Sequence, residues 1–463
     1  MTSGLFDDLP VQAVPGREGG GRPRLRTAER GQVELRAVSL DDLVPADHRV
    51  RLVWRFVEGL DLSAILARIK AVEGRPGHPP ADPRILMALW LFSTIEGIGS
   101  AREVARQCDE RLPFQWLCGG VSMNHKTLSD FRVGHGAILE RLLADSFAAL
   151  MAAGVAGLER VAQDGVRVRA SAGAASFRRH STLGECHRRA REEVARLRCE
   201  LDADPGAASR REAAARKRAA RDRERRVEAA LAMTAELRTM QEEKARKRAG
   251  RVGTDDDGAN DHGPDSSGKA TLPPAQKEPR ASTTDAGARV MKMADGSFRP
   301  AYNVQFAADT TSGAVAGVAV DNIGSDMGRM GPMSAALEAA YGQRPAEQLA
   351  DGGFAKLSDI TALTRAGVTP FVPVPAPRDK ARDRFAPRPD DPPEVAAWRR
   401  RMASDEAKDI YKQRAATVEC VNAQARNRGL TRFLVRGMDK VKAVALWHAL
   451  AHNMACGWRL VPA

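Results

Sequence analysis

The amino-acid sequence predicts a mixed α/β and α+β protein, in which a helical N-terminal domain precedes a domain built around a mixed sheet. Two observations support this prediction. Helical patterns separated by polar turns fill the first third of the chain. From about residue 156, stretches that alternate apolar and polar residues are added to the helical ones. The 463 residues leave room for two or three domains with at least one sizeable core.

The N-terminal part of the chain begins with residues 1–35, which are rich in Gly, Arg and Pro. They have no hydrophobic period, so we expect a flexible basic tail. Two short helices follow within the helical domain, and the second can begin at Asn124 or Thr127. This second helix contains Lys126 and Arg132. The pair resembles a helix-turn-helix unit, although an ordinary helical hairpin has the same pattern.

The second domain is predicted as strand, strand, strand, helix, strand, helix, strand, followed by a long helical stretch. The second and third strands should form a hairpin, and prolines in the last strand predict an edge position. The expected elements are, in order, residues 158–171, 301–309, 314–321, 327–342, 348–351, 357–367 and 368–375.

Two insertions interrupt this order, at 170–298 and 376–407. The first contains a basic helical hairpin at 185–250; residues 185–251 hold 20 Lys+Arg against 13 Asp+Glu. A solvated helical face would explain many of these charges, and an arm along DNA phosphates would use the same residues. A flexible linker at 252–289 is expected next. The second insertion is rich in Pro and Arg, and we expect it to be extended.

The charge balance favours a nucleic-acid partner. The chain has 72 Lys+Arg against 59 Asp+Glu, a net charge of +13. A membrane surface or an acidic partner would also attract such a chain. However, no run of 18 apolar residues predicts a membrane span, and the N-terminus lacks signal-peptide features. The six cysteines form no C-x-x-C pair, which argues against a zinc ribbon or a disulfide framework and indicates free thiols in a reducing cytoplasm.

Three acidic residues occupy comparable places. Asp164 lies in the first strand, Asp351 ends the fourth, and Glu419 lies in the C-terminal helical stretch. In a ribonuclease-H-like sheet the first and fourth strands are adjacent and parallel, and a helical acid approaches their ends. Three such carboxylates would repel one another, and Mg²⁺ would supply the counter-charge. Each acid also has an ordinary alternative as a turn or solvated residue, and Asp309 and Asp321 end strands too.

At these residues the chain resembles bacterial DDE-type insertion-sequence transposases with a ribonuclease-H-like catalytic domain. The resemblance runs from about residue 36 onwards, and implies a helical DNA-binding domain at 36–155 and a catalytic domain at 156–463. The stretches that support it are ERLPFQWLCGGVSMNHKTLSDFR, VAQDGVRVRASAGAASFRR, FRPAYNVQFAAD, LADGGFAK, YKQRAATVECVNAQARNRGLTRFLVRG and ALWHALAHNMACGWRL.

The resemblance implies that Asp164, Asp351 and Glu419 are the catalytic, metal-binding triad, with Mg²⁺ or Mn²⁺ as cofactor and two ions expected. It also implies binding to double-stranded DNA, both terminal inverted repeats and target, by a homodimer in the bacterial cytoplasm. Hydrolysis at the element end would be followed by strand transfer, with no covalent protein–DNA intermediate. The residues expected to contact DNA are Tyr411, Lys412, Arg414, Arg426, Lys126 and Arg132.

The number of residues between Arg414 and Glu419 differs from the pattern of the family. The family has a Tyr–Arg–Glu–Lys signature with two, three and six residues between members. Tyr411 and Arg414 fit, but four residues separate Arg414 from Glu419, and Arg426 replaces the lysine. On a regular helix Arg414 would be rotated away from Glu419, whereas Lys412 and Arg426 would share its face. A local bulge in the helix would restore the register.

Two other functional classes stay open. One is a ribonuclease-H-fold nuclease that cuts without strand transfer. The other is a catalytically inactive, DNA-binding relative, which the irregular Arg414–Glu419 spacing keeps under consideration. His125, His180 and His187 are expected to be structural or to contact phosphates, because no metal-ligand spacing surrounds them.

Overall fold

The computed structural model describes residues 37–74, 77–203, 207–249, 278–377, 379 and 381–460. The expected tail at 1–35 and most of the expected linker at 252–289 lie outside these ranges. Residues 37–43 belong to a separate unit, in which Asp42 accepts hydrogen bonds from the backbone N–H and the hydroxyl of Ser39. All described residues from Val44 on belong to one unit.

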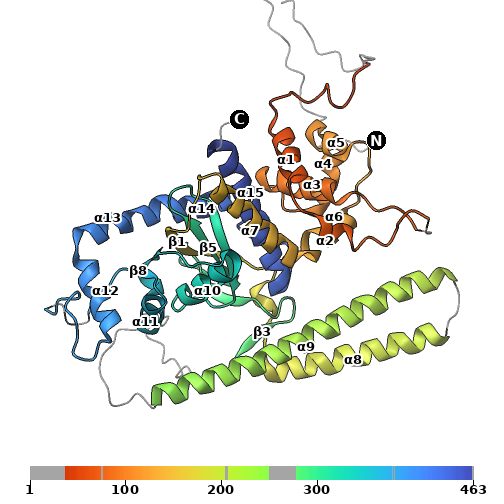
Figure 1. The fold of residues 1–463 in the computed structure, drawn as a ribbon. Coiled ribbons are helices and arrows are strands. Elements are labelled where there is room, and N and C mark those ends of the chain that lie inside the picture. The colour runs from red at the N-terminus through yellow and green to blue at the C-terminus, as the bar shows by residue number, and fades with distance from the viewer. Residues whose placement is uncertain are drawn as a thin grey trace, which may run out of the picture. The chain divides into compact units, whose positions relative to one another are not determined.

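The first part of this unit is helical, as predicted (Figure 1). Asn124 is the N-cap of α6, where its side-chain oxygen accepts from the backbone N–H groups of Lys126 and Thr127. Helix α3 is buried along most of its length, and the indole N–H of Trp90 donates to the Leu128 carbonyl. The helices are α1 (Arg49–Glu58), α2 (Ser63–Leu66), α3 (Pro83–Ile95), α4 (Ala101–Glu110), α5 (Leu112–Cys118), α6 (His125–Gly134) and α7 (Gly136–Ala152).

A mixed sheet follows, with strand order β4-β5-β1-β7-β8 and β6 paired with β5. The expected alternation of strands and helices is confirmed. β1 and β7 are adjacent and parallel, with Arg160 opposite Glu347, and β8 is at an edge, as its prolines predicted. The elements are β1 (Arg160–Arg169), β4 (Arg289–Lys292), β5 (Phe298–Asp309), β6 (Val315–Asp321), α10 (Met330–Tyr341), β7 (Glu347–Leu349), α11 (Leu357–Arg365) and β8 (Thr369–Phe371).

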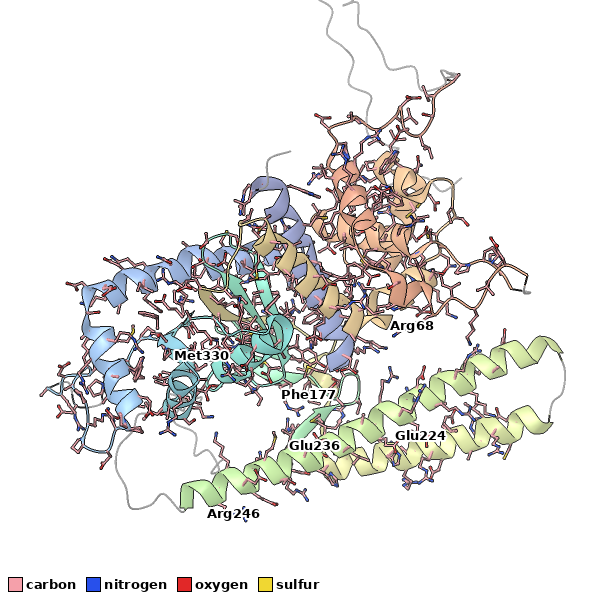
Figure 2. All side chains as sticks on the ribbon, in the orientation of Figure 1. Arg68, Phe177, Glu224, Glu236, Arg246 and Met330 are labelled. Carbon is pink, nitrogen blue, oxygen red and sulfur yellow. The ribbon has the colours of Figure 1, made fainter. Side chains whose placement is uncertain are left out.

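The helical hairpin consists of α8 (His180–Ala203) and α9 (Ala207–Ala249), so it begins earlier than predicted. Buried Leu183, Val227 and Ala230 hold it together. Three arginines of α8 pair with acids four residues away on the same helix. Arg191 of α8 lies 3.9 Å from Glu224 of α9, and Glu224 is labelled in Figure 2. Much of the charge is therefore that of a solvated helical surface.

The expected linker at 252–289 is too long. Its last part forms β3 (Arg280–Ser282), which pairs with β2 (Phe177–Arg179) beside the hairpin. β4 begins at Arg289 and pairs with β5 of the main sheet. These strands have only three or four residues, which is too short for an apolar period to show in the sequence.

The expectation of an extended segment at 376–407 is wrong in its second half. α12 (Pro393–Ala403) packs the Trp398 indole into the core, where its N–H donates to the Val372 carbonyl. Arg399 Nε lies 2.7 Å from Asp391 Oδ2, and both side chains are only 4% exposed. The arginines of this segment therefore include a structural ion pair.

Replacing Asp391 with alanine should lower the free energy of unfolding by about 3–5 kcal/mol, because the guanidinium of Arg399 would stay buried without its partner. Urea denaturation measures the change. Asp405→Ala is the matched control, since Asp405 pairs with Lys408 but is 94% exposed, and little or no loss of stability is expected there. Equal losses in the two variants would contradict the prediction.

The C-terminal helices join the helical part to the sheet. α15 (Met438–Leu460) packs against α3, α7 and β6. The Trp447 indole donates to the Arg132 carbonyl, and the Asn453 side chain bonds both backbone groups of Val315. α13 (Asp405–Arg414), a π-helical turn (Ala415–Glu419) and α14 (Cys420–Asn427) precede α15. The six cysteines are free, and in the described ranges no helix is both long and apolar enough to cross a membrane.

Candidate active site

Asp164 lies in the middle of β1 with its side chain largely buried. Its Oδ2 accepts a 2.9 Å hydrogen bond from the Asn422 amide, and its Oδ1 accepts from the Gly165 N–H. Burial and the negative charge of Asp351 raise the pKa of Asp164 to about 6, while the positive charge of Arg414 opposes this shift. The carboxylate is thus held by its neighbours in a place where its negative charge is unfavourable.

Asp351 follows the end of β7, with Ala350 between them. Its Oδ1 accepts a 2.7 Å hydrogen bond from the Gly353 N–H, which starts a 3-10 turn at Gly352–Phe354. The Asp-Gly turn therefore exists, and it fixes the carboxylate at the carboxyl end of a strand parallel to β1. The two acids thus belong to neighbouring parallel strands, and the charge of Asp351 contributes to the raised pKa of Asp164.

The π-helical turn decides the position of Glu419. A π-helix takes up one more residue per turn than an α-helix, and this turn spans the four residues between Arg414 and Glu419. Arg414 Nη2 lies 2.8 Å from Glu419 Oε1, and Arg414 Nη1 lies 3.8 Å from Asp164 Oδ2. The bulge expected from the irregular spacing is therefore present, and Arg414 connects the acids of the helix and of β1.

Tyr411 lies beside this cluster, with its ring centroid 5.8 Å from the guanidinium carbon of Arg414. Burial raises the pKa of the Tyr411 hydroxyl, and the charge of Arg414 counteracts the shift. Lys412 is exposed and pairs with Asp409 at 2.6 Å. Arg426 is exposed on α14, seven positions after Glu419. Four of the expected DNA contacts thus lie on α13 and α14 around the acids.

The two expected contacts on α6 lie elsewhere. Lys126 is exposed at the start of the helix. Arg132 is only 6% exposed, and its guanidinium carbon lies 4.7 Å from the ring centroid of Trp90. Arg132 therefore does not lie on the exposed face of α6, where a helix-turn-helix phosphate contact would be.

The other residues weighed as ligands are occupied by local contacts. Asp309 Oδ2 accepts from the backbone N–H and the hydroxyl of Ser312, so it is a turn acid. Asp321 Oδ2 lies 3.0 Å from Arg329 Nε. His180 bonds the Thr234 hydroxyl within the hairpin, which fits its expected structural role.

Asp326 is a residue that sequence reasoning missed. Its Oδ1 accepts 2.6 Å hydrogen bonds from the amides of Asn303 and Gln305 on β5, and its Oδ2 lies 3.4 Å from Arg167 on β1. It lies in a loop without apolar period, so no pattern indicated it. This network covers the backbone at Gly165, next to Asp164.

Gly165→Ala should reduce stability by about 1–3 kcal/mol, because the added Cβ would overlap the side chains of Asp326, Gln305 and Asn303. Thermal and urea unfolding measure the loss. Gly173→Ala is the matched control, since nothing lies within 4 Å of a Cβ built there and its φ is −90°. If the unfolding midpoint of Gly165→Ala equals that of the unmodified chain, β5 and the loop with Asp326 move to make room for the added methyl group.

Asp164, Asp351 and Glu419 carry carboxylate oxygens, the type of donor atom that a hard divalent cation such as Mg²⁺ prefers. Across the described part of the chain, no three His, Cys, Asp or Glu side chains are gathered closely enough to hold a metal ion. The guanidinium group of Arg414 supplies the positive charge between Asp164 and Glu419.

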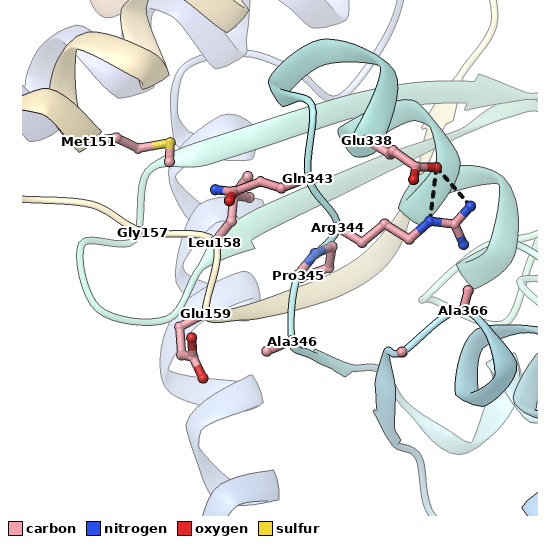
Figure 3. Close-up of a pocket in the computed structure, with 11 residues that line it drawn as sticks. Met151, Gly157, Leu158, Glu159, Glu338, Gln343, Arg344, Pro345, Ala346 and Ala366 are labelled. Atoms are coloured by element: carbon pink, nitrogen blue, oxygen red, sulfur yellow. Dashed lines mark hydrogen bonds and ion pairs between the residues drawn. The ribbon is translucent and has the colours of Figure 1, made fainter.

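A separate pocket, of about 580 Å³, is shown in Figure 3. It is lined by residues that precede β1 and β7, such as Glu159 and Ala346, and by the Glu338–Arg344 ion pair. β1 and β7 are parallel, and Asp351 lies after the carboxyl end of β7. The pocket therefore lies at the opposite, amino-terminal ends of these two strands. It is not part of the candidate active site.

Comparison with known families gives the class of protein. Residues 38–134 match the family described as "Transposase domain (DUF772)", and residues 379–456 match the family described as "Transposase DDE domain". Together the two matches support the identification of the chain as an insertion-sequence DDE transposase. The second match includes Tyr411, Arg414 and Glu419. No curated protein and no solved structure matches the chain.

Proposed function

We propose that this chain is an active DNA transposase, with Asp164, Asp351 and Glu419 as its catalytic triad. It binds the ends of its element as a homodimer, hydrolyses a phosphodiester there and transfers the freed strand to target DNA. Residues 156–463 form the catalytic domain, with the ribonuclease-H-like order of strands, and 36–155 form the DNA-binding domain. The observation that supports this best is the Arg414 contact with both Glu419 and Asp164 across the π-helical turn.

The three carboxylates would hold Mg²⁺ or Mn²⁺, and a pair of such ions would suit an in-line displacement. When bound, such ions activate the attacking water and stabilise the leaving oxygen. The chain's own residues prepare this site: Asn422 orients Asp164, and the Gly353 N–H orients Asp351. Arg414 offsets the repulsion among the acids and, once released from Glu419, can bind a phosphate.

The DNA strand would lie along α13 and α14. Tyr411, Lys412 and Arg426 present a ring and two cations beside the acids, and these groups suit the phosphates next to the cut. Water is the first nucleophile and the 3′-hydroxyl of the element is the second, so no residue of the chain needs to form a covalent bond to DNA.

A cleavage assay tests the proposal. The substrate is a labelled duplex that joins the element's terminal repeat to its flanking DNA, with Mg²⁺ or with EDTA. We expect a Mg²⁺-dependent cut at the boundary, followed by joining to a target plasmid. A cut without joining would indicate a nuclease, and binding without any cut would indicate an inactive relative.

A further inference from the structure

A second pocket, of about 340 Å³, lies between the helical part and the segment that follows α14; we call it the arginine pocket. Buried and exposed residues both line it, so it reaches the surface. The residues that matter here are Trp90, Arg132, Arg428, Thr431, Trp447 and His448.

Arg132 is the most buried cation of this pocket. Its guanidinium packs on Trp90 and one of its nitrogens donates to the Gly99 carbonyl, but its Nε is buried without a hydrogen-bond partner. Among the described residues no carboxylate lies within ion-pair distance of it. Burial lowers the pKa of Arg132 to about 10, which reflects a positive charge without a counter-charge.

Arg428 and His448 add to this positive potential. Burial lowers the pKa of Arg428, which has no acidic partner among the described residues. Burial and the charges of Arg428 and Arg132 lower the pKa of His448 to about 3, so its ring is neutral at pH 7. Its Nδ1 is buried and has no hydrogen-bond partner. Two guanidinium groups and one imidazole thus share a pocket without an anion.

We propose that the arginine pocket binds one backbone phosphate of the DNA strand that is held at the active site. This inference rests on the proposed transposase function. Guanidinium groups bind phosphate oxygens with paired, charge-assisted hydrogen bonds, and a neutral imidazole can donate one more. A phosphate would supply the counter-charge that Arg132 and Arg428 lack.

The position of Arg428 favours DNA as the source of the phosphate. Arg428 caps α14 nine residues after Glu419, and at 1.5 Å per residue this is about 13 Å along the helix axis. With the duplex axis parallel to α14, that distance corresponds to a rise of about four nucleotide steps. The pocket would therefore fix the strand a few nucleotides from the cut.

The first experiment measures binding of phosphate to the arginine pocket in the absence of DNA. Inorganic phosphate is titrated into the full chain at constant ionic strength, with chloride as the control anion, and tryptophan fluorescence is followed because Trp90 and Trp447 line the pocket. We expect a saturable change that chloride does not give. Thr431→Asp, which places a negative charge at an exposed position of the pocket, should abolish the change, whereas the uncharged, matched Thr431→Asn should retain it.

The second experiment identifies the source of the phosphate. Single methylphosphonates, which remove the charge of one phosphate at a time, are scanned along the element-end duplex. At one position we expect binding by the unmodified chain to weaken about tenfold, as for the loss of one charge-assisted contact. Arg428→Gln should bind about tenfold more weakly to unmodified DNA. The methylphosphonate at that position should not weaken the binding of this variant further. Circular dichroism of Arg428→Gln and of both Thr431 variants controls for folding.

The outcomes separate this inference from the proposed function. No fluorescence response to phosphate, or equal methylphosphonate losses in Arg428→Gln and the unmodified chain, overturns the inference while cleavage can remain intact. A phosphate response without any position-specific coupling means that the pocket takes free phosphate, which overturns the assignment to DNA. Failure of the chain to bind or cut end DNA refutes the transposase proposal, and the fluorescence titration then still decides whether the pocket binds phosphate.

Discussion

Replacing Glu419 with glutamine is expected to abolish DNA cleavage and leave DNA binding unchanged. The substitution keeps the size of the side chain but removes one negative charge from the proposed metal site. Loss of a metal ligand removes several kcal/mol of transition-state stabilisation, or about a thousandfold or more in rate. Cleavage of a labelled end duplex and gel-shift binding to the same duplex measure the two effects.

The control for this variant is Glu406→Gln, which removes the same charge from an exposed position on α13. It should cleave at the rate of the unmodified chain. Cleavage by Glu419→Gln at a similar rate would remove Glu419 from the triad. A parallel loss of binding would instead assign Glu419 to holding Arg414, with which it forms its ion pair.

Inserting one alanine after Ala416 should also abolish cleavage, by at least about a hundredfold. Each added helical residue turns the following residues by 100°, so Glu419 would leave Arg414 and point away from Asp164. Ala415 and Ala416 are exposed, whereas Thr417 and Val418 are buried. Cleavage rate and circular dichroism together separate a misplaced acid from an unfolded chain.

Deleting Ala416 is the matched control and should retain most of the activity. The deletion converts the π-helical turn to a regular turn, in which Arg414 and Glu419 become four positions apart and still share a face. Deletion and insertion both change the chain by one exposed alanine, yet only the insertion breaks the register. Loss of activity in both would mean that the π-helical geometry itself is required.

The sequence predicted the elements that have a period or a cap. The β5–β6 hairpin and the Asn124 cap of α6 were expected from apolar alternation, turn residues and capping chemistry. The parallel pairing of β1 and β7 was expected only from the ribonuclease-H-like sheet that the chain resembles. β3 was missed because three residues show no alternation. The Arg399–Asp391 pair was missed because composition does not tell a buried arginine from an exposed one.

The candidate site was predicted less completely. The nature of the three acids pointed to a metal, and the π-helical turn that places Glu419 beside Arg414 was indicated only by the irregular spacing between these two residues. Asp326 comes from a loop, and the position of Arg132 inside the fold depends on the packing of Trp90. Such contacts come from tertiary packing between segments far apart in the chain, which short-range patterns do not encode.

Helix α15 has a consequence for synthesis on the ribosome. It follows every other described element in the chain, yet it covers apolar surfaces of α3, α7 and β6. A nascent chain must therefore keep these surfaces uncovered until α15 has left the exit tunnel, and during that time they can bind a chaperone or another nascent chain. The backbone N–H and carbonyl of Val315 also lack their Asn453 partner until this helix has been synthesised.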